Sequence, residues 1–419
     1  MEETCKRPRY LDHVSKPVVG NYHERSTQYD DFSHIVVEES ESIPQESSQF
    51  LASIYSSTRF STKMSSRQKI RTPLTDLFGV KHPVMLAGMG VAAGPKLAAA
   101  VTNAGGIGVI GGHGYSPDGL REQIGELKSY LVDKDAPFGV DILLPQVGGN
   151  ARKTNYDYTK GKLMELIDVV VESKARVFVS AIGVPPRQAV ERLHAGGVLY
   201  MNMIGHPKHV QKCLDLDVDI LCAQGGEAGG HTGDIPFSVL IPAVAKLLKG
   251  KKSALTGVDV QLVAAGGVSG GESLAAALML GASGVWVGTR FIVAHEAGAS
   301  KAHQEAVLTA TVDDTIRSVI FSGRPLRIRK TPYILNWEEN RQQEIKTLTG
   351  KGILPVQNDA EEHPDDEDVL DNLHPYLMGI VAGAVNHRSS AREIVDEIVD
   401  GAVEKLRLGS VMLVNESKL

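Results

Sequence analysis

His231 is the residue whose sequence surroundings best suit it to catalysis. It ends the stretch CAQGGEAGGH (222–231), in which glycine pairs stand on both sides of Glu227. The ordinary pKa of histidine is about 6.5, so this side chain can act as a base at neutral pH. An ordinary surface histidine is the alternative, since the chain has 14 histidines. Glu227 could be a second acid or base, although a glutamate beside glycines is more commonly solvated.

Two glycine turns further along the chain could bind a phosphate. Gly266-Gly267 closes the apolar run 261–265, and Gly288-Thr289 closes the run 285–287. Glycine lets backbone N–H groups approach a phosphate closely. One Gly-Gly alone is ordinary turn chemistry, but (β/α)8 barrels place a phosphate in the loops after strands seven and eight. We therefore predict that the backbone amides of these four residues hold a phosphate.

The residues between the two turns predict a helix that joins two parallel strands. Ser269 stands three residues before Glu272, which is the spacing of a capping box, and an Ala/Leu-rich stretch follows. Gly281 is expected to end that helix. The whole stretch therefore reads as a strand–helix–strand unit with both strands ending at the same edge.

The same alternation of strand and helix runs back along the chain from Val84. Apolar runs closed by glycine predict eight strands, with amphipathic stretches between them. The predicted strands are 84–89, 107–111, 138–144, 177–182, 199–204, 220–223, 262–265 and 285–287. The predicted helices are 95–103, 116–131 with Pro117 at its first position, 163–173, 187–195, 209–216, 236–248 and the helix after Ser269. Alternating elements indicate an α/β fold with a parallel sheet, open and doubly wound or closed. We prefer a (β/α)8 TIM barrel over residues 72–311, which has the size of that domain.

The remaining segments divide as follows. Residues 1–71 are polar and without period, which predicts a largely disordered N-terminal extension. A helix is expected over 294–310, at the end of the barrel. Residues 312–374 form a basic, aromatic segment that is expected to lie over the barrel mouth. Within it, the acidic run at 359–371 is expected to be a solvated loop. Helices over 375–408 are expected to pack on the barrel, the last one opened by a capping box at Ser390–Glu393, and 409–419 is a tail.

The composition excludes several classes of protein. The net charge is −6 and no basic stripe is present, so nothing supports nucleic-acid binding. The apolar runs are far shorter than the roughly 18 residues of a membrane span. Three cysteines without a CxxC pattern indicate a reducing compartment and no metal site.

Several stretches at the predicted strand ends also match a known family. They are HPVMLAGMG (82–90), AGGIGVIGG (104–112), AQGGEAGGHTG (223–233), and VAAGG and VGTRF at strands seven and eight. The chain resembles the nitronate monooxygenase (2-nitropropane dioxygenase) family of FMN-dependent TIM barrels. The resemblance runs from about Thr72 to about Thr311, and more weakly through 377–385.

The resemblance implies a bound FMN and assigns residues to it. His231 matches the catalytic base of the family, and Gln224 matches a glutamine that contacts the flavin. Asp141 departs from the pattern, because many relatives carry a neutral asparagine there, and a carboxylate near a flavin would disfavour negative charge on the reduced ring. The residues implied to bind the cofactor are Ala87, Gly88, Met89, Asp141, Gln224, Gly229, Gly230, Ala265, Gly266, Gly267, Gly288 and Thr289.

The function implied is FMN-dependent oxidation of alkyl nitronates, or of nitroalkanes after deprotonation, with O2 as electron acceptor. An FMN-dependent reductase that uses NAD(P)H, of the enoyl-thioester type, resembles the same motifs. Chemistry like that of inosine-monophosphate dehydrogenase needs a loop cysteine, whereas Cys222 lies in a predicted strand. A barrel that binds FMN without turnover is the alternative from outside the enzymes.

The chain ends in Ser417-Lys418-Leu419. A terminal SKL is an address read by the peroxisomal import receptor. We therefore expect a peroxisomal location, with the cytoplasm as the alternative.

Overall fold

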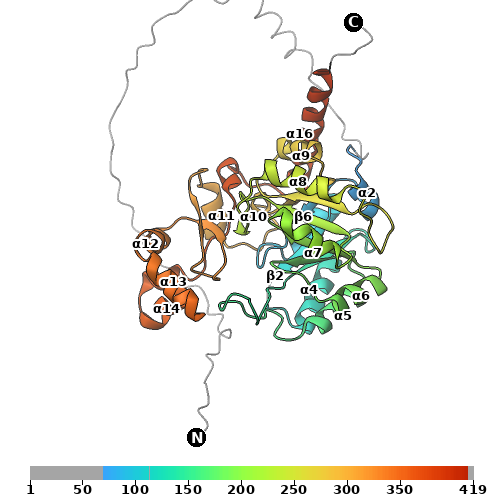
Figure 1. The fold of residues 1–419 in the computed structure, drawn as a ribbon. Coiled ribbons are helices and arrows are strands. Elements are labelled where there is room, and N and C mark those ends of the chain that lie inside the picture. Colours follow the sequence, from blue (N-terminus) through green and yellow to red (C-terminus); the bar gives the residue numbers. More distant parts are fainter. Residues whose placement is uncertain (1–68, 113, 414–419) are drawn as a thin grey trace, which may run out of the picture. The chain divides into compact units, whose positions relative to one another are not determined.

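The computed structural model describes residues 69–112 and 114–413. At its centre are eight parallel strands with helices outside them (Figure 1). The neighbours follow one another in the order β1-β9-β8-β6-β5-β4-β3-β2. The bounds are β1 (Val84–Leu86), β2 (Gly108–Gly112), β3 (Phe138–Leu143), β4 (Val177–Ala181), β5 (Leu199–Ile204), β6 (Ile220–Gln224), β8 (Gln261–Ala265) and β9 (Gly284–Val287). All eight predicted strands are confirmed.

The two edge strands, β1 and β2, meet and close the sheet. The Ile107 amide donates to the Val84 carbonyl at 2.9 Å, and the Leu86 amide donates to the Ile107 carbonyl at 2.9 Å. Ile107 and Met85 thereby form a parallel bridge just before β2 begins. The structure is therefore the predicted (β/α)8 TIM barrel and not an open sheet.

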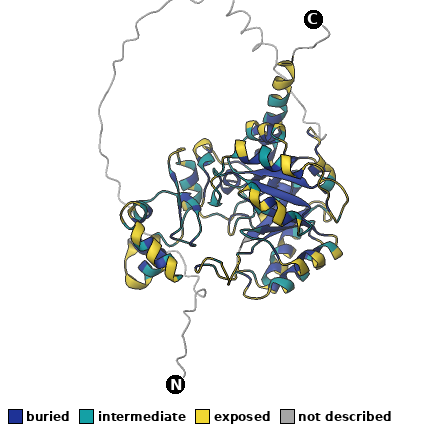
Figure 2. Cartoon of the chain, viewed as in Figure 1, coloured by how far each residue is buried: buried dark blue, intermediate teal, exposed yellow. Residues whose placement is uncertain are grey.

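Residues of the barrel strands alternate between two cores. One set points into the barrel, among them Val109, Met201, Cys222 and Trp286. The intervening residues pack against the surrounding helices, whose outer faces are exposed (Figure 2). Two-sided burial explains why the strands read as nearly continuous apolar runs.

Most barrel helices lie where the sequence predicts them. Pro117 is the first residue of its helix, and the Ser116 hydroxyl accepts from the Gly119 amide at 3.0 Å. The helices before and between the barrel strands are α2 (Pro73–Phe78), α3 (Pro95–Asn103), α4 (Pro117–Tyr130), α5 (Leu163–Glu172), α6 (Arg187–Ala195), the 3-10 turn η1 (Pro207–His209), α7 (Val210–Leu214), α8 (Phe237–Leu248) and α9 (Gly271–Met279).

The predicted capping box before α9 is wrong. The helix begins at Gly271, its N-cap is Gly270, and no side chain caps it. Gly266 and Gly267 have φ of 90° and 72°, so the chain is still turning sharply just before the position where Ser269 was expected to cap the helix. Gly281, with φ of 99°, follows the helix end as predicted.

The helix predicted over 294–310 is only half present. After the short α10 (Thr289–Ile292), helix α11 spans Lys301–Leu308 and is capped by the Ser300 hydroxyl. The preceding residues are held in turns, because Ala294 bridges to Ser389 and the Gly298 amide donates to the Ala92 carbonyl at 3.1 Å. The first contact attaches the segment to the chain around Ser389, and the second attaches it to the loop after β1.

A second, antiparallel sheet follows the barrel. Its strands are β10 (Thr315–Ser318), β11 (Leu326–Arg329) and the two-residue β7 (Gly230–His231). β11 lies between the other two. The segment predicted to lie over the barrel mouth therefore reaches the glycine loop that carries His231.

The acidic run at 359–371 is solvated over 361–367, as predicted, but most of the run is helical and its first residue is buried, which corrects the prediction of a loop. Asp359 is buried, and its carboxylate accepts from the Tyr333 hydroxyl at 2.8 Å and the Trp337 indole at 3.1 Å. Arg341 pairs with it at 2.9 Å and stacks over the Trp337 ring. One buried carboxylate of α14 (Pro355–Glu362) thus joins that helix to α12 (Pro332–Asn340) and to Arg341, which directly precedes α13 (Gln342–Lys351). Helix α15 (Glu367–Asp371) follows α14.

Helix α16 (Ala391–Val411) follows the 3-10 turn η2 (Ile380–Ala384) and packs on α9. The predicted capping box forms between Ser390 and Glu393. A Cβ on Gly271 of α9 would lie 2.2 Å from the backbone of Gly401, so the two helices meet at glycines. The helix runs further than expected and takes in the start of the predicted tail, while Ser417-Lys418-Leu419 and the extension to residue 68 lie outside the described residues.

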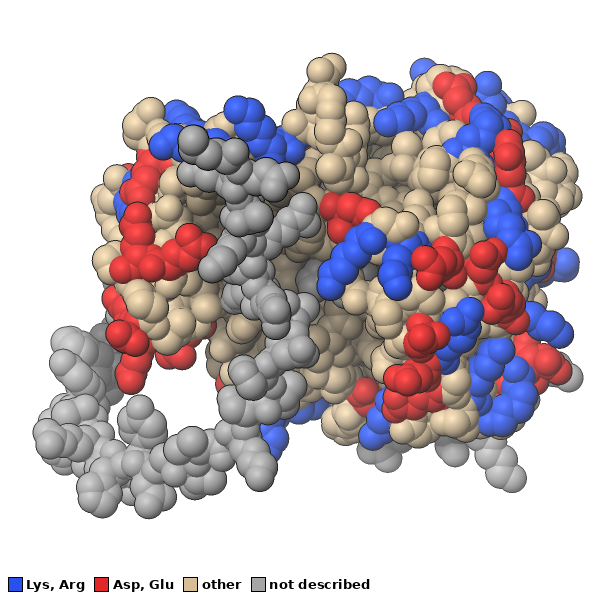
Figure 3. All heavy atoms as spheres, turned by 90° about the horizontal axis from the view of Figure 1, so that it is seen from below, with Lys and Arg blue, Asp and Glu red and all other residues tan. Residues whose placement is uncertain are grey.

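Lysines and arginines are interspersed with aspartates and glutamates over the face seen in Figure 3. Within residues 69–112 and 114–413, no helix has the length and apolar character to cross a membrane. The same residues contain no cluster of histidine, cysteine and carboxylate side chains able to hold a metal ion.

Candidate active site

The predicted cofactor residues gather at the carboxyl end of the barrel. Strand register places Gln224, the last residue of β6, beside Ala265, the last residue of β8, and Ala265 beside Trp286 of β9. Leu86 of β1 lies beside Val287. Because all these strands are parallel, the loops that follow them meet at one end, which is where TIM barrels place their active sites.

The turn after β8 has the shape of a phosphate cradle. Gly266 and Gly267 have positive φ values, which a side chain rarely tolerates. A Cβ on Gly267 would have only one atom within 4 Å, the Cβ of Glu227 at 3.8 Å, so the space there is open. Helix α9 begins behind this turn, and Gly288 and Thr289 begin α10 on the neighbouring strand. The residues present therefore fit a phosphate held by backbone amides.

Thr289 has a further contact inside the protein. Its hydroxyl accepts from the Gly379 amide at 3.0 Å and is buried. The side chain of Thr289 therefore ties the loop at 379 to the barrel.

The loop after β1 packs closely against its neighbours. A Cβ on Gly88 would lie 2.3 Å from the carboxylate of Asp141, and one on Gly111 would lie 2.3 Å from the Cα of Gly88. A Cβ on Gly288 would lie 3.4 Å from Ala87 and 3.6 Å from Met89. The structure thus brings together the Ala87-Gly88-Met89 loop, Asp141 and the phosphate cradle.

Asp141 is buried on β3, pointing into the barrel with an exposure of 2%. Within the described residues, its Oδ1 has no hydrogen-bond partner. Burial raises the pKa of Asp141 to about 8, so the carboxyl is mostly protonated at neutral pH. A protonated carboxyl is uncharged and has the shape of an asparagine side chain. The charge that made Asp141 a departure from the family pattern is therefore absent.

Replacing Asp141 with asparagine is expected to flatten the dependence of stability on pH. The folded-state pKa of about 8 exceeds the ordinary value of an aspartate. The folded protein therefore holds a proton that the unfolded chain releases above about pH 4, and stability falls as pH rises from about 4 to about 8. Melting temperatures of wild type and Asp141→Asn, measured side by side from pH 5 to 8.5, test this because all other groups are common to both. Parallel curves would contradict it.

His231 lies on a strand and not on a free loop. It pairs with Leu326 of β11 in the second sheet. Its backbone carbonyl accepts from the Gln224 side-chain amide at 3.0 Å, and its ring Nε2 lies 2.9 Å from the Ser322 hydroxyl. The imidazole is therefore positioned from both sides at the barrel mouth. Sequence reasoning missed Ser322, because no local signal links residues 91 positions apart.

The other residues of the glycine loop have structural roles. The Glu227 carboxylate accepts from the Phe237 amide at 3.0 Å and so caps α8, which corrects the interpretation of a solvated side chain. A Cβ on Gly229 would lie 2.6 Å from the backbone of Met378, whereas Gly230, with φ of 70°, has Leu377 at 3.7 Å as its near neighbour. Gly229 is thus a packing glycine, and Gly230 allows the turn into β7.

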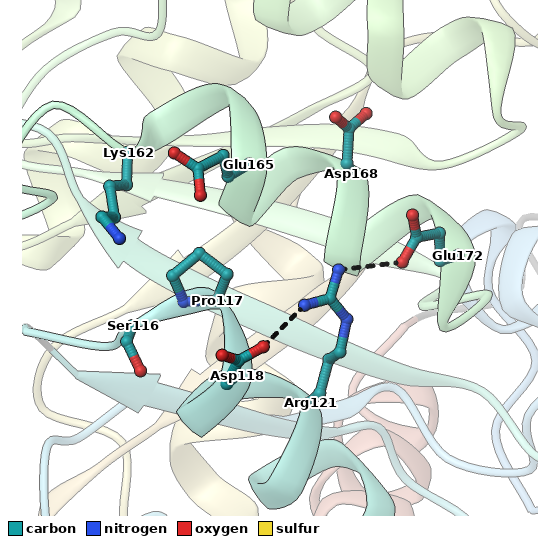
Figure 4. Close-up of a pocket in the computed structure, with 8 residues that line it drawn as sticks. All are labelled: Ser116, Pro117, Asp118, Arg121, Lys162, Glu165, Asp168 and Glu172. Carbon is teal, nitrogen blue, oxygen red and sulfur yellow. Dashed lines mark hydrogen bonds and ion pairs between the residues drawn. The ribbon is translucent and has the colours of Figure 1, made fainter.

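A separate groove lies outside the barrel, between α4 and α5. Its volume is about 240 Å³, and Arg121 pairs there with Asp118 at 3.0 Å and with Glu172 at 3.3 Å (Figure 4). Both helices cover the outer face of the strands, so this groove does not belong to the cofactor site.

The chain matches a known protein family over most of its length. The nitronate monooxygenase profile matches residues 71–401, which includes the barrel, the second sheet and about the first half of α16. The chain belongs to the nitronate monooxygenase family. It is accordingly a flavin-dependent oxidoreductase.

Relatives within this family have different names. A (3aS,4S,5R,7aS)-5-hydroxy-7a-methyl-1-oxo-octahydro-1H-indene-4-carboxyl-CoA dehydrogenase of Rhodococcus jostii is 35% identical over 370 residues, covering 80% of this chain and 97% of the relative. A probable nitronate monooxygenase of Bacillus subtilis is 29% identical and covers 77% of this chain and 93% of the relative.

The similar solved structures also include proteins with different names. FabK from Thermotoga maritima is 27% identical with a TM-score of 0.65, covering 82% of this chain and 100% of that chain. Nitroalkane oxidase from Streptomyces ansochromogenes is 25% identical with a TM-score of 0.65, covering 80% of this chain and 99% of that chain.

Proposed function

We propose that this chain binds one noncovalent FMN and oxidises alkyl nitronates, or nitroalkanes after deprotonation, with O2 as electron acceptor. The observation that carries the proposal is His231, whose ring and backbone are both fixed at the barrel mouth beside the phosphate cradle. The relatives named as nitronate monooxygenases and the similarity to nitroalkane oxidase support the same chemistry.

The residues of the site have two proposed roles, which are binding of the cofactor and transfer of a proton. The backbone amides of Gly266, Gly267, Gly288 and Thr289 would hold the phosphate. Bound FMN supplies the acceptor for the two electrons of the oxidation. His231 removes the proton from the carbon that bears the nitro group, and its contact with Ser322 keeps the imidazole in place while the proton is transferred.

The visible spectrum of the purified protein tests the proposal. Without oxygen, propionate 3-nitronate should bleach the flavin, and admission of air should restore the colour. NADH alone should leave the spectrum unchanged. Bleaching by NADH but not by the nitronate would replace the proposal with a reductase, and no response to either would favour a barrel that binds flavin without turnover.

Oxidation or reduction of a CoA thioester is the second candidate. The observation in its favour is that relatives 33% and 35% identical to this chain are named as carboxyl-CoA dehydrogenases. The same anaerobic spectra distinguish this candidate from nitronate oxidation. If the chain acts on a CoA thioester, an acyl-CoA or enoyl-CoA, and not the nitronate, will change the oxidation state of the flavin.

We also propose that Ser417-Lys418-Leu419 directs import into peroxisomes when the chain ends with Leu419. Deleting Leu419 from a chain tagged at its N-terminus should leave the protein in the cytosol. Fluorescence microscopy beside a peroxisomal marker measures this. A peroxisomal signal that survives the deletion would place the address elsewhere in the chain.

A further inference from the structure

Two arginines from distant segments meet beside His231. Arg152 belongs to the loop between β3 and α5, and Arg324 to the turn between β10 and β11. An Nη1 group of Arg152 donates to the Gly323 carbonyl at 3.1 Å, and Nε of Arg324 donates to the Asn155 side chain at 3.0 Å. Each segment therefore holds the arginine of the other.

The turn that carries Arg324 also contacts the base. Ser322 lies two residues before Arg324, and its hydroxyl is 2.9 Å from the His231 ring. The turn is tightly seated, because a Cβ on Gly323 would lie 2.0 Å from the Thr154 hydroxyl. The position of Arg324 relative to His231 is thus fixed by the same few residues.

Neither arginine has a carboxylate partner within the described residues. Neighbouring arginines do: Arg329 pairs with Asp314 at 3.5 Å, and Arg317 pairs with Asp234. The two terminal nitrogens of Arg324 make no hydrogen bond within the described part of the chain. Partial burial and the charge of Arg152 both lower the pKa of Arg324. Two like charges held together without a counter-ion are unfavourable unless an anion joins them.

We propose that Arg152 and Arg324 form an anion subsite of the substrate pocket, which takes a phosphate or carboxylate group of a substrate whose reacting carbon lies at His231. The planar guanidinium offers paired N–H donors that match either group. The inference rests on the proposed function for the place of the reacting carbon and adds to it the class of substrate, which carries a negative charge remote from that carbon.

Two sources could supply this anion, and matched ligands separate them. 4′-Phosphopantetheine and pantetheine differ in one phosphate, whereas 3-nitropropionate and 1-nitropropane differ in a carboxylate. Binding of all four to the oxidised, flavin-loaded protein is measured by the change in the flavin spectrum directly after rapid mixing, before any reduction of the flavin, and so needs no turnover. Failure of nitronate oxidation would therefore overturn the proposed function and leave this test intact.

The variants are Arg324→Gln, Arg152→Gln and Arg324→Lys. Arg187→Gln is the matched control, because Arg187 lies on α6 outside the barrel and is exposed, with Asp217 as its partner at 3.0 Å. Wild type should bind the charged member of at least one pair more tightly, by roughly tenfold or more for each arginine. Arg324→Gln should remove most of this preference, Arg324→Lys should retain part of it, and added salt should reduce it.

The outcomes are separable. A preference confined to the pantetheine pair assigns a phosphate, and one confined to the nitro pair assigns a carboxylate. The proposal is overturned if wild type shows no preference in either pair, if the variants weaken charged and uncharged ligands equally, or if Arg187→Gln loses as much. Arg152→Gln changes an exposed side chain and serves the same test if Arg324→Gln does not fold.

Discussion

Replacing His231 with asparagine is expected to slow turnover of a neutral nitroalkane by about 10²–10⁴-fold, or roughly 3–5 kcal/mol of barrier. Asparagine keeps the backbone carbonyl that Gln224 binds but cannot take up a proton. A preformed nitronate is already deprotonated and does not need this step. The variant should therefore keep much of its activity on the nitronate.

The measurement compares kcat/KM for nitroethane and for ethyl nitronate in the same preparations. His209→Asn is a suitable control, since that side chain is exposed and belongs to the 3-10 turn η1 after β5. Equal losses on both substrates would show that His231 binds substrate and does not remove a proton. Equal retention on both would make it an ordinary loop histidine.

Replacing Gly267 with valine is expected to abolish FMN binding. The valine side chain would occupy the open space beside the turn, where the phosphate is proposed to lie. The same change also strains the backbone by about 1–3 kcal/mol, because φ at Gly267 is 72°. Strain alone would destabilise the protein without selecting against the cofactor.

Gly257→Val separates these two effects. Gly257 has φ of 73°, no atom within 4 Å of an added Cβ, and a place in the loop before β8, at the opposite end of the barrel. Flavin content and the Kd for FMN of the refolded apoprotein are measured for both variants. We expect a colourless Gly267→Val and a yellow Gly257→Val. A yellow Gly267→Val with unchanged affinity would remove the phosphate assignment.

The barrel could be predicted from sequence because its signals are local. Each strand is a short apolar run closed by glycine, and Pro117 and Ser390 mark helix starts by chemistry contained within four residues. The convergence of Ala265, Gly266 and Gly288 follows from the parallel register once eight strands are counted.

What could not be predicted depends on partners far away in the chain. Nothing near Asp359 indicates that Arg341, Trp337 and Tyr333 bury it. Likewise, the two-residue strand that holds His231 exists only because β11 arrives about a hundred positions later. The protonation state of Asp141 could not be predicted without knowing that the side chain is buried. The sequence alone suggests a charged carboxylate, whereas burial favours the protonated form.

The place of His231 on the second sheet bears on how long the enzyme survives heat. The proposed flavin site lies at the ends of barrel strands, which belong to the central core of the fold. His231 lies in a two-residue strand that pairs with the β10–β11 hairpin, and such sheet edges open locally at a smaller cost in free energy. Thermal inactivation would then begin as a loss of proton abstraction in a protein that is still folded and still yellow. Substitutions that stabilise the β10–β11 hairpin would therefore lengthen the lifetime of the active enzyme more than substitutions in the barrel core.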